Sequence, residues 1–234
     1  MLAEGTYFVI NHPPPSEDFS LQRIIIFANG ELPNLEKAHT LLQRGDYIIC
    51  ADGGTRHALA MNITPDLIIG DMDSVEKGEL HKFQESEVPI ELFPHDKNET
   101  DLELAIQRAV EMMPAHILIV AGLGGRLDQT LANITLLTGH RLSTLDIRLD
   151  DGVEETFFCR DRVQVHGKSG DIVSLIPWGG EVSGVETENL KWPLKNETLY
   201  PYKTRGISNE MLGEEASVKI KSGLLLVVHR VKNS

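Results

Sequence analysis

From Arg23 onwards, short apolar runs alternate with segments in which apolar residues recur every three or four positions. The apolar runs occupy residues 24–27, 47–50, 67–69, 90–93 and 117–120. Helices are predicted at residues 35–43, 57–61 and 102–110. This alternation is typical of parallel strands joined by crossover helices, and continuous apolar strands indicate a sheet covered on both faces. We therefore expect a three-layer α/β domain with a mainly parallel sheet.

Beyond about residue 150 the pattern predicts strands without helices. The strands are expected at 153–159, 163–165, 172–176, 218–220 and 224–228, with glycine, asparagine and proline turns between them. Such a series indicates a small antiparallel sandwich or barrel, and we favour an all-β sandwich. The chain then divides into an extended, proline-containing leader (1–22), an α/β domain (23–148) and a β-sandwich domain (149–234).

The helix near residue 102 has a defined start. Thr100 and Glu103 match a capping box, in which Thr100 caps the helix and Glu103 reaches back. Asp101 then lies in the first turn, where the helix dipole favours a carboxylate for purely structural reasons. A functional role for Asp101 therefore depends on its neighbours.

Composition narrows the class of protein. The 234 residues carry a formal net charge of −13, which argues against a nucleic-acid backbone as the main partner. Cys50 and Cys159 both follow apolar residues and resemble buried thiols, so we expect a cytoplasmic protein without disulfides. No apolar run approaches the length of a transmembrane helix, and the first residues lack a signal-peptide pattern, so no membrane partner is expected.

Two carboxylates directly follow the apolar run 67–69. In extended backbone, Asp71 and Asp73 point the same way and can share one ion. Oxygen ligands at a strand end suit Mg²⁺, which prefers a few carboxylates together with water and substrate phosphates. The alternative is an acidic turn that ends the strand, because Asp and Ser are common turn residues.

Polar and glycine-rich segments follow the neighbouring strands as well. Asp52-Gly53-Gly54 follows the run 47–50, the segment from His95 to Asp101 follows 90–93, and the segment 122–129 follows 117–120. In an open α/β sheet, ligands bind at the carboxyl ends of the strands, so these segments indicate a metal–nucleotide site. The P-loop and protein-kinase motifs are absent, which leaves positioning and electrostatic stabilisation of phosphoryl groups as the available chemistry.

Several short motifs occur along the chain: Ala51-Asp52-Gly53-Gly54, Gly70-Asp71-Met72-Asp73-Ser74 after Pro65-Asp66, Lys97-Asn98-Glu99-Thr100-Asp101, Gly124-Gly125-Arg126-Leu127-Asp128-Gln129 and Gly206-Ile207-Ser208-Asn209. In this order, they resemble the thiamine pyrophosphokinase (thiamine diphosphokinase) family over almost the whole chain from Arg23. The resemblance implies transfer of a diphosphate group from ATP to thiamine, with release of AMP and a requirement for Mg²⁺. It also implies a homodimer in which the active site lies between the α/β domain of one subunit and the β domain of the other.

The resemblance also suggests roles for individual residues. The metal ligands would be Asp71, Asp73 and Asp101, and these residues with Arg126 and Asp128 would be catalytic. The ATP-binding residues would be Asp52, Gly53, Gly54, Lys97 and Thr100. The attacking hydroxyl would be oriented or deprotonated by Asp73 or Asp101, and the sequence does not decide between them.

For thiamine, the resemblance indicates Ser208 and Asn209, with Trp192 as an aromatic wall. The alternatives are that Trp192 is a core residue and that Ser208-Asn209 is only a turn. Two positions depart from the family pattern: Asn98 replaces a frequent Asp, and Asn189 replaces a frequent Gly but tolerates a positive φ angle.

Two other functions fit the same motifs. One is diphosphate transfer to a different alcohol, and the other is a non-catalytic module that senses thiamine diphosphate. The complete set of acids, with Lys97 and Arg126, favours an enzyme, since binding alone does not require the full metal set.

Overall fold

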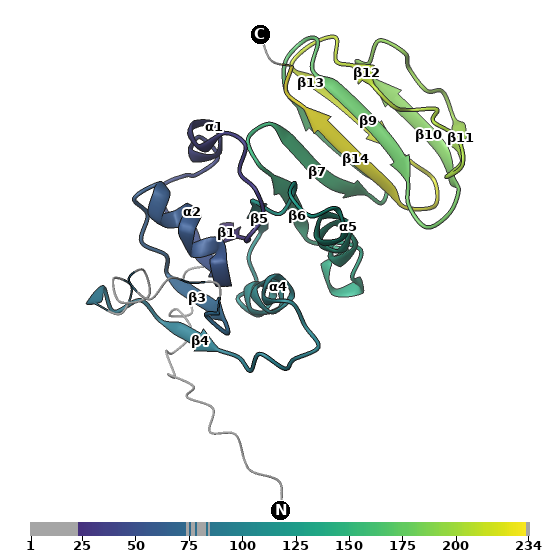
Figure 1. The fold of residues 1–234 in the computed structure, drawn as a ribbon. Helices are drawn as coiled ribbons and strands as arrows, with labels where there is room; N and C mark the ends of the chain where they lie inside the picture. Colours follow the sequence, from purple (N-terminus) through teal and green to yellow (C-terminus); the bar gives the residue numbers. More distant parts are fainter. Residues whose placement is uncertain (1–22, 74, 76–77, 79–82, 84, 233–234) are drawn as a thin grey trace, which may run out of the picture.

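The computed structural model describes residues 23–73, 75, 78, 83 and 85–232, and the expected leader 1–22 lies outside them (Figure 1). The elements of the first half are β1 (Arg23–Phe27), α1 (Leu35–His39), β2 (Tyr47–Ala51), η1 (Asp52–Gly54), α2 (Thr55–Ala60), β3 (Leu67–Gly70), β4 (Ile90–Leu92), α4 (Asp101–Glu111), β5 (His116–Val120), α5 (Leu127–Leu136), η2 (His140–Leu142) and β6 (Asp146–Asp150). Those of the second half are β7 (Glu154–Cys159), β8 (Arg162–His166), β9 (Ile172–Pro177), β10 (Val182–Glu188), β11 (Glu197–Leu199), β12 (Asn209–Glu210), β13 (Glu215–Lys219) and β14 (Leu225–Arg230).

Ten strands form one large sheet in the order β12-β9-β14-β7-β6-β5-β1-β2-β3-β4. The six strands from β6 to β4 are parallel, with β1 hydrogen-bonded between β5 and β2. The other four, β7, β14, β9 and β12, pair antiparallel. The parallel part matches the prediction from the apolar runs.

Helices cover the parallel part on both faces, so the predicted three-layer arrangement is confirmed. Side chains of α4 and α5 pack with Ile24 and Ile26 of β1 on one face. On the other face, Ala38 of α1 and Ala58 of α2 pack with Phe27. Among the described residues, no helix is long and apolar enough to cross a membrane.

A second sheet, in the order β11-β10-β13-β8, packs on the antiparallel part of the large sheet. The core between the two sheets includes Phe157 and Val227 from the large sheet and Val165 and Val218 from the small one. The predicted β-sandwich is therefore present (Figure 1).

The large sheet passes without a break from the α/β part into the sandwich, through β6 and β7. Leu149 of β6 pairs with Thr156 of β7, and β6 itself continues the parallel sheet beside β5. The sequence predicted no strand at β6, because only two of its five residues, Ile147 and Leu149, are apolar. The division at residues 148 and 149 stays a prediction.

Three further strands were not expected from the sequence. In β10, Gly184 has a φ of 65° and the register with β11 shifts between Val182 and Val185, which interrupts the alternation of apolar and polar positions. Strands β11 and β12 have only three and two residues, too few to give a periodic signal.

Candidate functional site

The site is built from loops at the carboxyl ends of β2, β3 and β4. Asp52 directly follows β2, Asp71 directly follows β3, and Asp101 begins α4 after β4. Because these strands are parallel neighbours, their ends meet at one edge of the sheet. A carboxylate oxygen from each of the three acids lies within 4.8 Å of the other two.

Asp52 is the most buried member of this group. The residue is 4% exposed, and its Oδ1 atom has no hydrogen-bond partner among the described residues. Its φ of 43° is uncommon for a residue with a side chain and is typical of functional sites. Gly70 allows the close approach, because a Cβ there would lie 2.9 Å from Asp52 Cβ and 3.2 Å from Asp101 Oδ1.

The donor set suits a hard cation. An unpaired, buried carboxylate oxygen is costly unless a ligand satisfies it, and three carboxylates within 4.8 Å repel one another without a cation. All three donors are oxygens, which is the preference of Mg²⁺. The residues therefore fit the expected metal.

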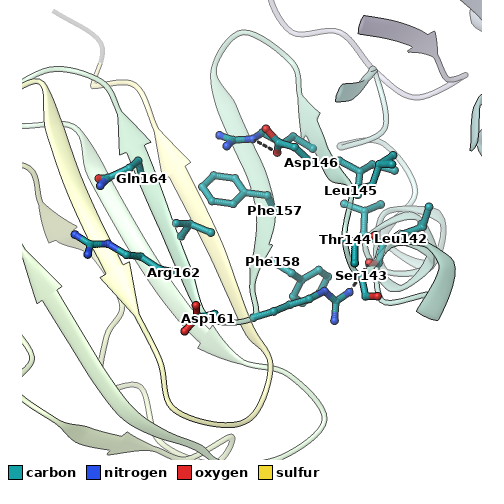
Figure 2. Close-up of a pocket in the computed structure, with 15 residues that line it drawn as sticks. Leu142, Ser143, Thr144, Leu145, Asp146, Phe157, Phe158, Asp161, Arg162 and Gln164 are labelled. Carbon is teal, nitrogen blue, oxygen red and sulfur yellow. Dashed lines mark hydrogen bonds and ion pairs between the residues drawn. The ribbon is translucent and has the colours of Figure 1, made fainter. Parts of the chain in front are cut away.

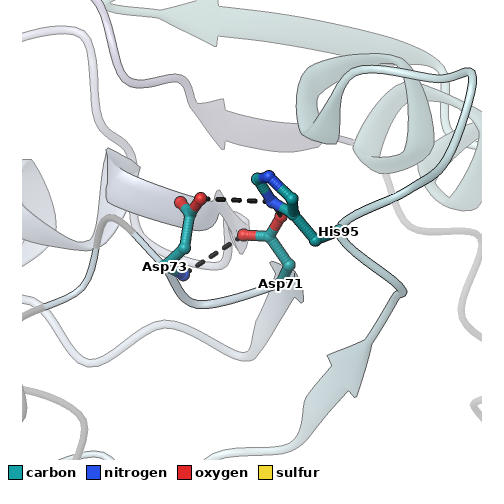
Figure 3. Close-up of side chains that lie close together, drawn as sticks. All are labelled: Asp71, Asp73 and His95. Atoms are coloured by element: carbon teal, nitrogen blue, oxygen red, sulfur yellow. Dashed lines mark hydrogen bonds and ion pairs between the residues drawn. The ribbon is translucent and has the colours of Figure 1, made fainter.

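Asp73 lies in a second group with Asp71 and His95 (Figure 3). The Nδ1 atom of His95 is 2.8 Å from Oδ2 of Asp71 and 3.3 Å from Oδ2 of Asp73. The backbone N–H of Asp73 donates to Oδ1 of Asp71 over 3.1 Å. Asp71 therefore belongs to both groups. Ser74, the last residue of this motif, lies outside the described residues.

The sequence motifs assign no role to His95, although the segment that it begins is expected at this edge of the sheet. Its position just after the apolar run 90–93, two residues before Lys97, was the available signal. The hydrogen bond that His95 donates to the carboxylate of Asp71 raises the pKa of His95. Burial alone raises the pKa of Asp71, but the hydrogen bonds from His95 and from the Asp73 backbone, with the charge of Lys97, lower it overall.

Lys97 connects the two acids at this edge. Its Nζ is 3.0 Å from Asp101 Oδ1 and 3.6 Å from Asp71 Oδ2, and its side chain is 11% exposed. Burial raises the pKa of Asp101 in spite of Lys97, and the charges of Asp52 and Asp71 raise it further. Burial alone lowers the pKa of Lys97, but the carboxylates of Asp101 and Asp71 raise it overall. The ammonium group is thus held between carboxylates at a helix start, where a phosphate is also favoured.

The remaining residues predicted to bind ATP have defined structural roles. The predicted cap is present, because Thr100 Oγ1 accepts a hydrogen bond of 3.2 Å from the backbone N–H of Glu103. A Cβ on Gly54 would lie 2.0 Å from the carbonyl oxygen of Phe27, and one on Gly53 would meet the side chain of Asn29 at 2.5 Å. The two glycines therefore let η1 pack against the end of β1.

Arg126 and Asp128 lie apart from the acids. Arg126 Nε donates to Asp128 Oδ1 over 3.1 Å, and the side chains are 72% and 65% exposed. The hydrogen bond from Arg126 lowers the pKa of Asp128. No contact in the described part of the chain joins this pair to Asp52, Asp71 or Asp101.

The three residues predicted for thiamine come together in the sandwich. Trp192, Ser208 and Asn209 line a pocket of about 360 Å³ together with Leu194, Arg205, Gly206 and Ile207. Trp192 is 48% exposed, so it is not a core residue. The amide of Asn209 is buried and engaged: Oδ1 accepts from the backbone N–H of Trp192, and Nδ2 donates to the carbonyl of Trp192.

A larger pocket, of about 420 Å³, lies elsewhere (Figure 2). It is formed where β6 begins and β7 ends, with Phe157 and Phe158 facing the segment 142–146. Because β5 and β6 are parallel, this is the amino end of the strands, opposite the edge that carries the acids. It contains none of the predicted site residues.

Comparisons with known proteins agree with this layout. The model of "Thiamin pyrophosphokinase, catalytic domain" matches residues 38–171, and that of "Thiamin pyrophosphokinase, vitamin B1 binding domain" matches residues 161–225. The first range contains both acidic groups, and the second contains the pocket beside Trp192.

Individual relatives span most of the chain. Thiamine pyrophosphokinase 1 of Oryza sativa subsp. japonica is 28% identical over 242 residues, which cover 90% of this chain and 88% of that protein. The crystal structure of thiamine pyrophosphokinase from Bacillus subtilis superposes with a TM-score of 0.82 and 25% identity, over 91% of this chain and 100% of that one. The enzyme from Candida albicans, at 15% identity and a TM-score of 0.78, shares the fold. The chain belongs to the thiamine pyrophosphokinase family.

Proposed function

We propose that the acids at the carboxyl edge of the sheet catalyse transfer of an intact diphosphate group from ATP to the hydroxyl of thiamine, with release of AMP. The chain is an ATP-dependent thiamine diphosphokinase, as both family models and the named relatives support. The observation that carries the residue assignment is the convergence of Asp52, Asp71 and Asp101, with Lys97, at the start of α4.

In this proposal Asp71, Asp73 and Asp101 would hold Mg²⁺. Asp71 and Asp101 lie in one group with Asp52, whose unpaired Oδ1 would offer a further oxygen, and Asp73 would reach the ion from the adjoining group that it forms with Asp71. A bound Mg²⁺ neutralises negative charge on the phosphate oxygens and orients them for in-line attack. Asp73 and Asp101 remain the two candidates for orienting or deprotonating the hydroxyl of thiamine.

The phosphates of ATP are proposed to be bound by Lys97, Thr100 and the N–H groups of the first turn of α4. Lys97 exchanges the carboxylate of Asp101 for a phosphate oxygen when ATP and the cation arrive, because the cation then compensates the carboxylates. Arg126 exchanges Asp128 for a phosphate in the same way, and its high exposure leaves it room to turn. Asp52, Gly53 and Gly54 shape the nucleotide pocket.

Thiamine is proposed to bind in the pocket beside Trp192 and Ser208. The exposed indole offers an aromatic face, and the Ser208 hydroxyl offers a polar group to the aminopyrimidine. Because the side-chain amide of Asn209 is hydrogen-bonded to the backbone of Trp192, we propose that Asn209 positions the indole of Trp192.

We also propose a homodimer with the active site between subunits, and the sheet topology supports this proposal. Strand β12, beside the thiamine pocket, and strand β3, beside the acids, are eight strand steps apart in one sheet. At about 4.8 Å per step the separation is roughly 38 Å, farther than one substrate reaches. Figure 1 shows β12 and β3 at opposite ends of the molecule. This separation supports the proposal that the acids of one copy act on thiamine bound in the pocket of a second copy.

We place the reaction in the cytoplasm. The two cysteines, Cys50 and Cys159, are buried free thiols, and burial raises the pKa of Cys159 to about 11, so neither is prepared for oxidation.

The direct test is to incubate the purified chain with thiamine, ATP and Mg²⁺ and to quantify AMP and thiamine diphosphate by chromatography. Equal amounts of both products, lost on chelation, are expected. AMP without thiamine diphosphate would indicate another acceptor alcohol. Absence of turnover despite stabilisation by thiamine diphosphate would favour a sensing module.

A further inference from the structure

We propose that Lys191 and Glu210 position the indole of Trp192, and that they thereby set the affinity of the pocket beside it for thiamine. Neither Lys191 nor Glu210 lines that pocket. Both are therefore positioning residues, which act on the ligand through Trp192. The inference rests on the proposed function in one respect, namely that thiamine binds beside the indole.

The backbone of Trp192 is fixed by pairing between two segments of the sandwich. Residues 189–192 run antiparallel to residues 209–212, and the N–H of Lys191 donates to the carbonyl of Glu210 over 2.9 Å. The N–H and carbonyl groups of Trp192 are hydrogen-bonded within the same pairing. Trp192 is nevertheless 48% exposed, so these backbone contacts do not by themselves choose a rotamer for its side chain.

The side chain of Lys191 supplies that restraint. Its Nζ lies 4.7 Å from the centroid of the indole ring and 3.0 Å from Oε2 of Glu210. An ammonium group over an aromatic face is attracted by the ring quadrupole, and the carboxylate of Glu210 keeps the flexible lysine in this position. Because Lys191 does not line the pocket, it covers the indole from outside and leaves the pocket side of the ring for a ligand.

The size of the expected effect follows from this contact. A cation over an exposed aromatic ring corresponds to a change of about two- to fivefold in an equilibrium constant. If the indole turns freely, only part of its population presents the ring to the pocket, and the apparent affinity falls by that fraction. Loss of the restraint therefore raises the KM for thiamine and leaves the KM for ATP and kcat unchanged.

The first test observes the indole directly. Trp178→Phe makes Trp192 the only tryptophan of the chain, and this single-tryptophan chain is the parent for the fluorescence variants. Lys191→Met keeps the apolar stem and removes the ammonium group. Without ligand, time-resolved fluorescence anisotropy is expected to show a larger fast depolarisation in Lys191→Met than in the parent. Fluorescence titration with thiamine is expected to give a Kd about two- to fivefold higher.

Two further variants separate positioning from a general loss of structure. Lys191→Arg keeps a cation over the ring and a partner for Glu210, so it should restore the anisotropy and the Kd of the parent. Glu210→Gln removes the charge that holds Lys191, so a rise in Kd is expected here as well. Because Glu210 acts through Lys191, adding Glu210→Gln to Lys191→Met should bring no further rise. In the product assay, Lys191→Met should raise only the KM for thiamine.

Lys203→Met is the matched control. Its Nζ lies 5.1 Å from the centroid of the Tyr200 ring, so the same kind of contact is removed from a lysine that also lies outside the pocket lining. This variant is expected to change neither the anisotropy nor the Kd. Unchanged anisotropy or unchanged Kd in Lys191→Met, or an equal rise in Kd in Lys203→Met, would overturn this inference alone. Failure of the unmodified chain to bind thiamine would overturn the proposed function and this inference with it.

Discussion

Individual residues in this chain are held in conformations that bring like charges together. Asp52 has a φ of 43°, Met72 a φ of 62°, and Gly70 a φ of 153° beside a carboxylate of Asp101. The backbone strain at Asp52 and Met72 persists where the surrounding fold imposes it, and such strain commonly marks functional sites. The resulting cluster is unfavourable without a cation, so stability and activity are expected to oppose each other here.

Asp52→Asn tests this opposition. Asn tolerates a positive φ and has the same shape, so the variant removes charge repulsion and little else. Without divalent cations we expect about 1–2 kcal/mol of added stability, or a rise in Tm of roughly 2–8 °C. With Mg²⁺ the variant is expected to gain less in Tm than the unmodified chain and to lose about tenfold or more in turnover.

Calorimetry with chelator and with Mg²⁺ measures the two changes in Tm, and the product assay described above measures turnover. Asp161→Asn, which neutralises an exposed acid on the turn between β7 and β8, serves as the control and should change neither quantity. If Asp52→Asn lowered Tm without cations, Asp52 would be a structural residue and the cation site would be placed wrongly.

At the scale of elements, the start of α4 combines a helix cap with a proposed phosphate site. Thr100→Ala removes the hydroxyl that accepts from Glu103, which is expected to cost about 1 kcal/mol. Thr100→Ser keeps the hydroxyl and should retain stability. If Thr100 also binds phosphate, Thr100→Ala raises the KM for ATP and Thr100→Ser does not. Urea denaturation measures the stability of each variant, and steady-state kinetics measure its KM for ATP. An equal loss of stability or of ATP affinity in Thr100→Ala and Thr100→Ser would implicate the methyl group rather than the hydroxyl.

Strands β6, β7 and β14, with Asp171 before β9, carry a partly buried row of charges that makes stability depend on pH. Arg148 contacts Glu155 at 2.7 Å, and His229 lies 3.7 Å from Glu155 and 3.2 Å from Asp171. Burial opposes the charge of His229, but hydrogen bonds to the two carboxylates raise its pKa overall. Burial also raises the pKa of Asp150, at the end of β6, from 3.8 to about 7.

A carboxyl group with a higher pKa when folded binds more protons in the folded state. Asp150 therefore lowers the free energy of unfolding as pH rises from about 4 to about 7, and the raised pKa of His229 adds a loss in the same direction at higher pH. The pKa values of Glu155 and Asp171 are lowered overall, although burial raises them, so their contribution is lost only as pH falls in the acid range.

Asp150→Asn is expected to flatten this slope and to be more stable than the unmodified chain at pH 8. The amide oxygen still accepts the hydrogen bond of 2.7 Å from the N–H of Gly152, so the turn is kept. Urea denaturation midpoints at pH 5 and pH 8 measure the slope, with Asp161→Asn as the control for loss of an acid. An unchanged slope would mean that Asp150 titrates normally in the folded chain.

At the scale of the whole molecule, the sequence predicts the layers better than the connections between them. Apolar runs such as 24–27 identify the parallel strands directly, and the resemblance to the family identifies Asp52, Asp71 and Asp101. Strand β6 is not predicted because its polar positions carry the paired residues Asp146 and Arg148. His95 is not predicted as a site residue because a lone histidine in a loop has no periodicity, and only the fold brings it to Asp71.

The separation of the two half-sites across the ten-stranded sheet gives the sharpest test of the assembly. Asp71→Asn disables the acidic half and leaves the thiamine pocket, whereas Trp192→Ala disables the pocket and leaves the acids. If each active site takes its halves from two subunits, a heterodimer of the two variants contains one fully native site. Co-unfolding and refolding an equal mixture, or co-expression, is therefore expected to restore about a quarter of normal activity, since half of random dimers are mixed and each has one native site of two. Each variant alone should stay inactive or nearly so. A single-chain site would give no recovery, because every chain in the mixture carries a defect, and a solution mass equal to one active chain would contradict the dimer directly.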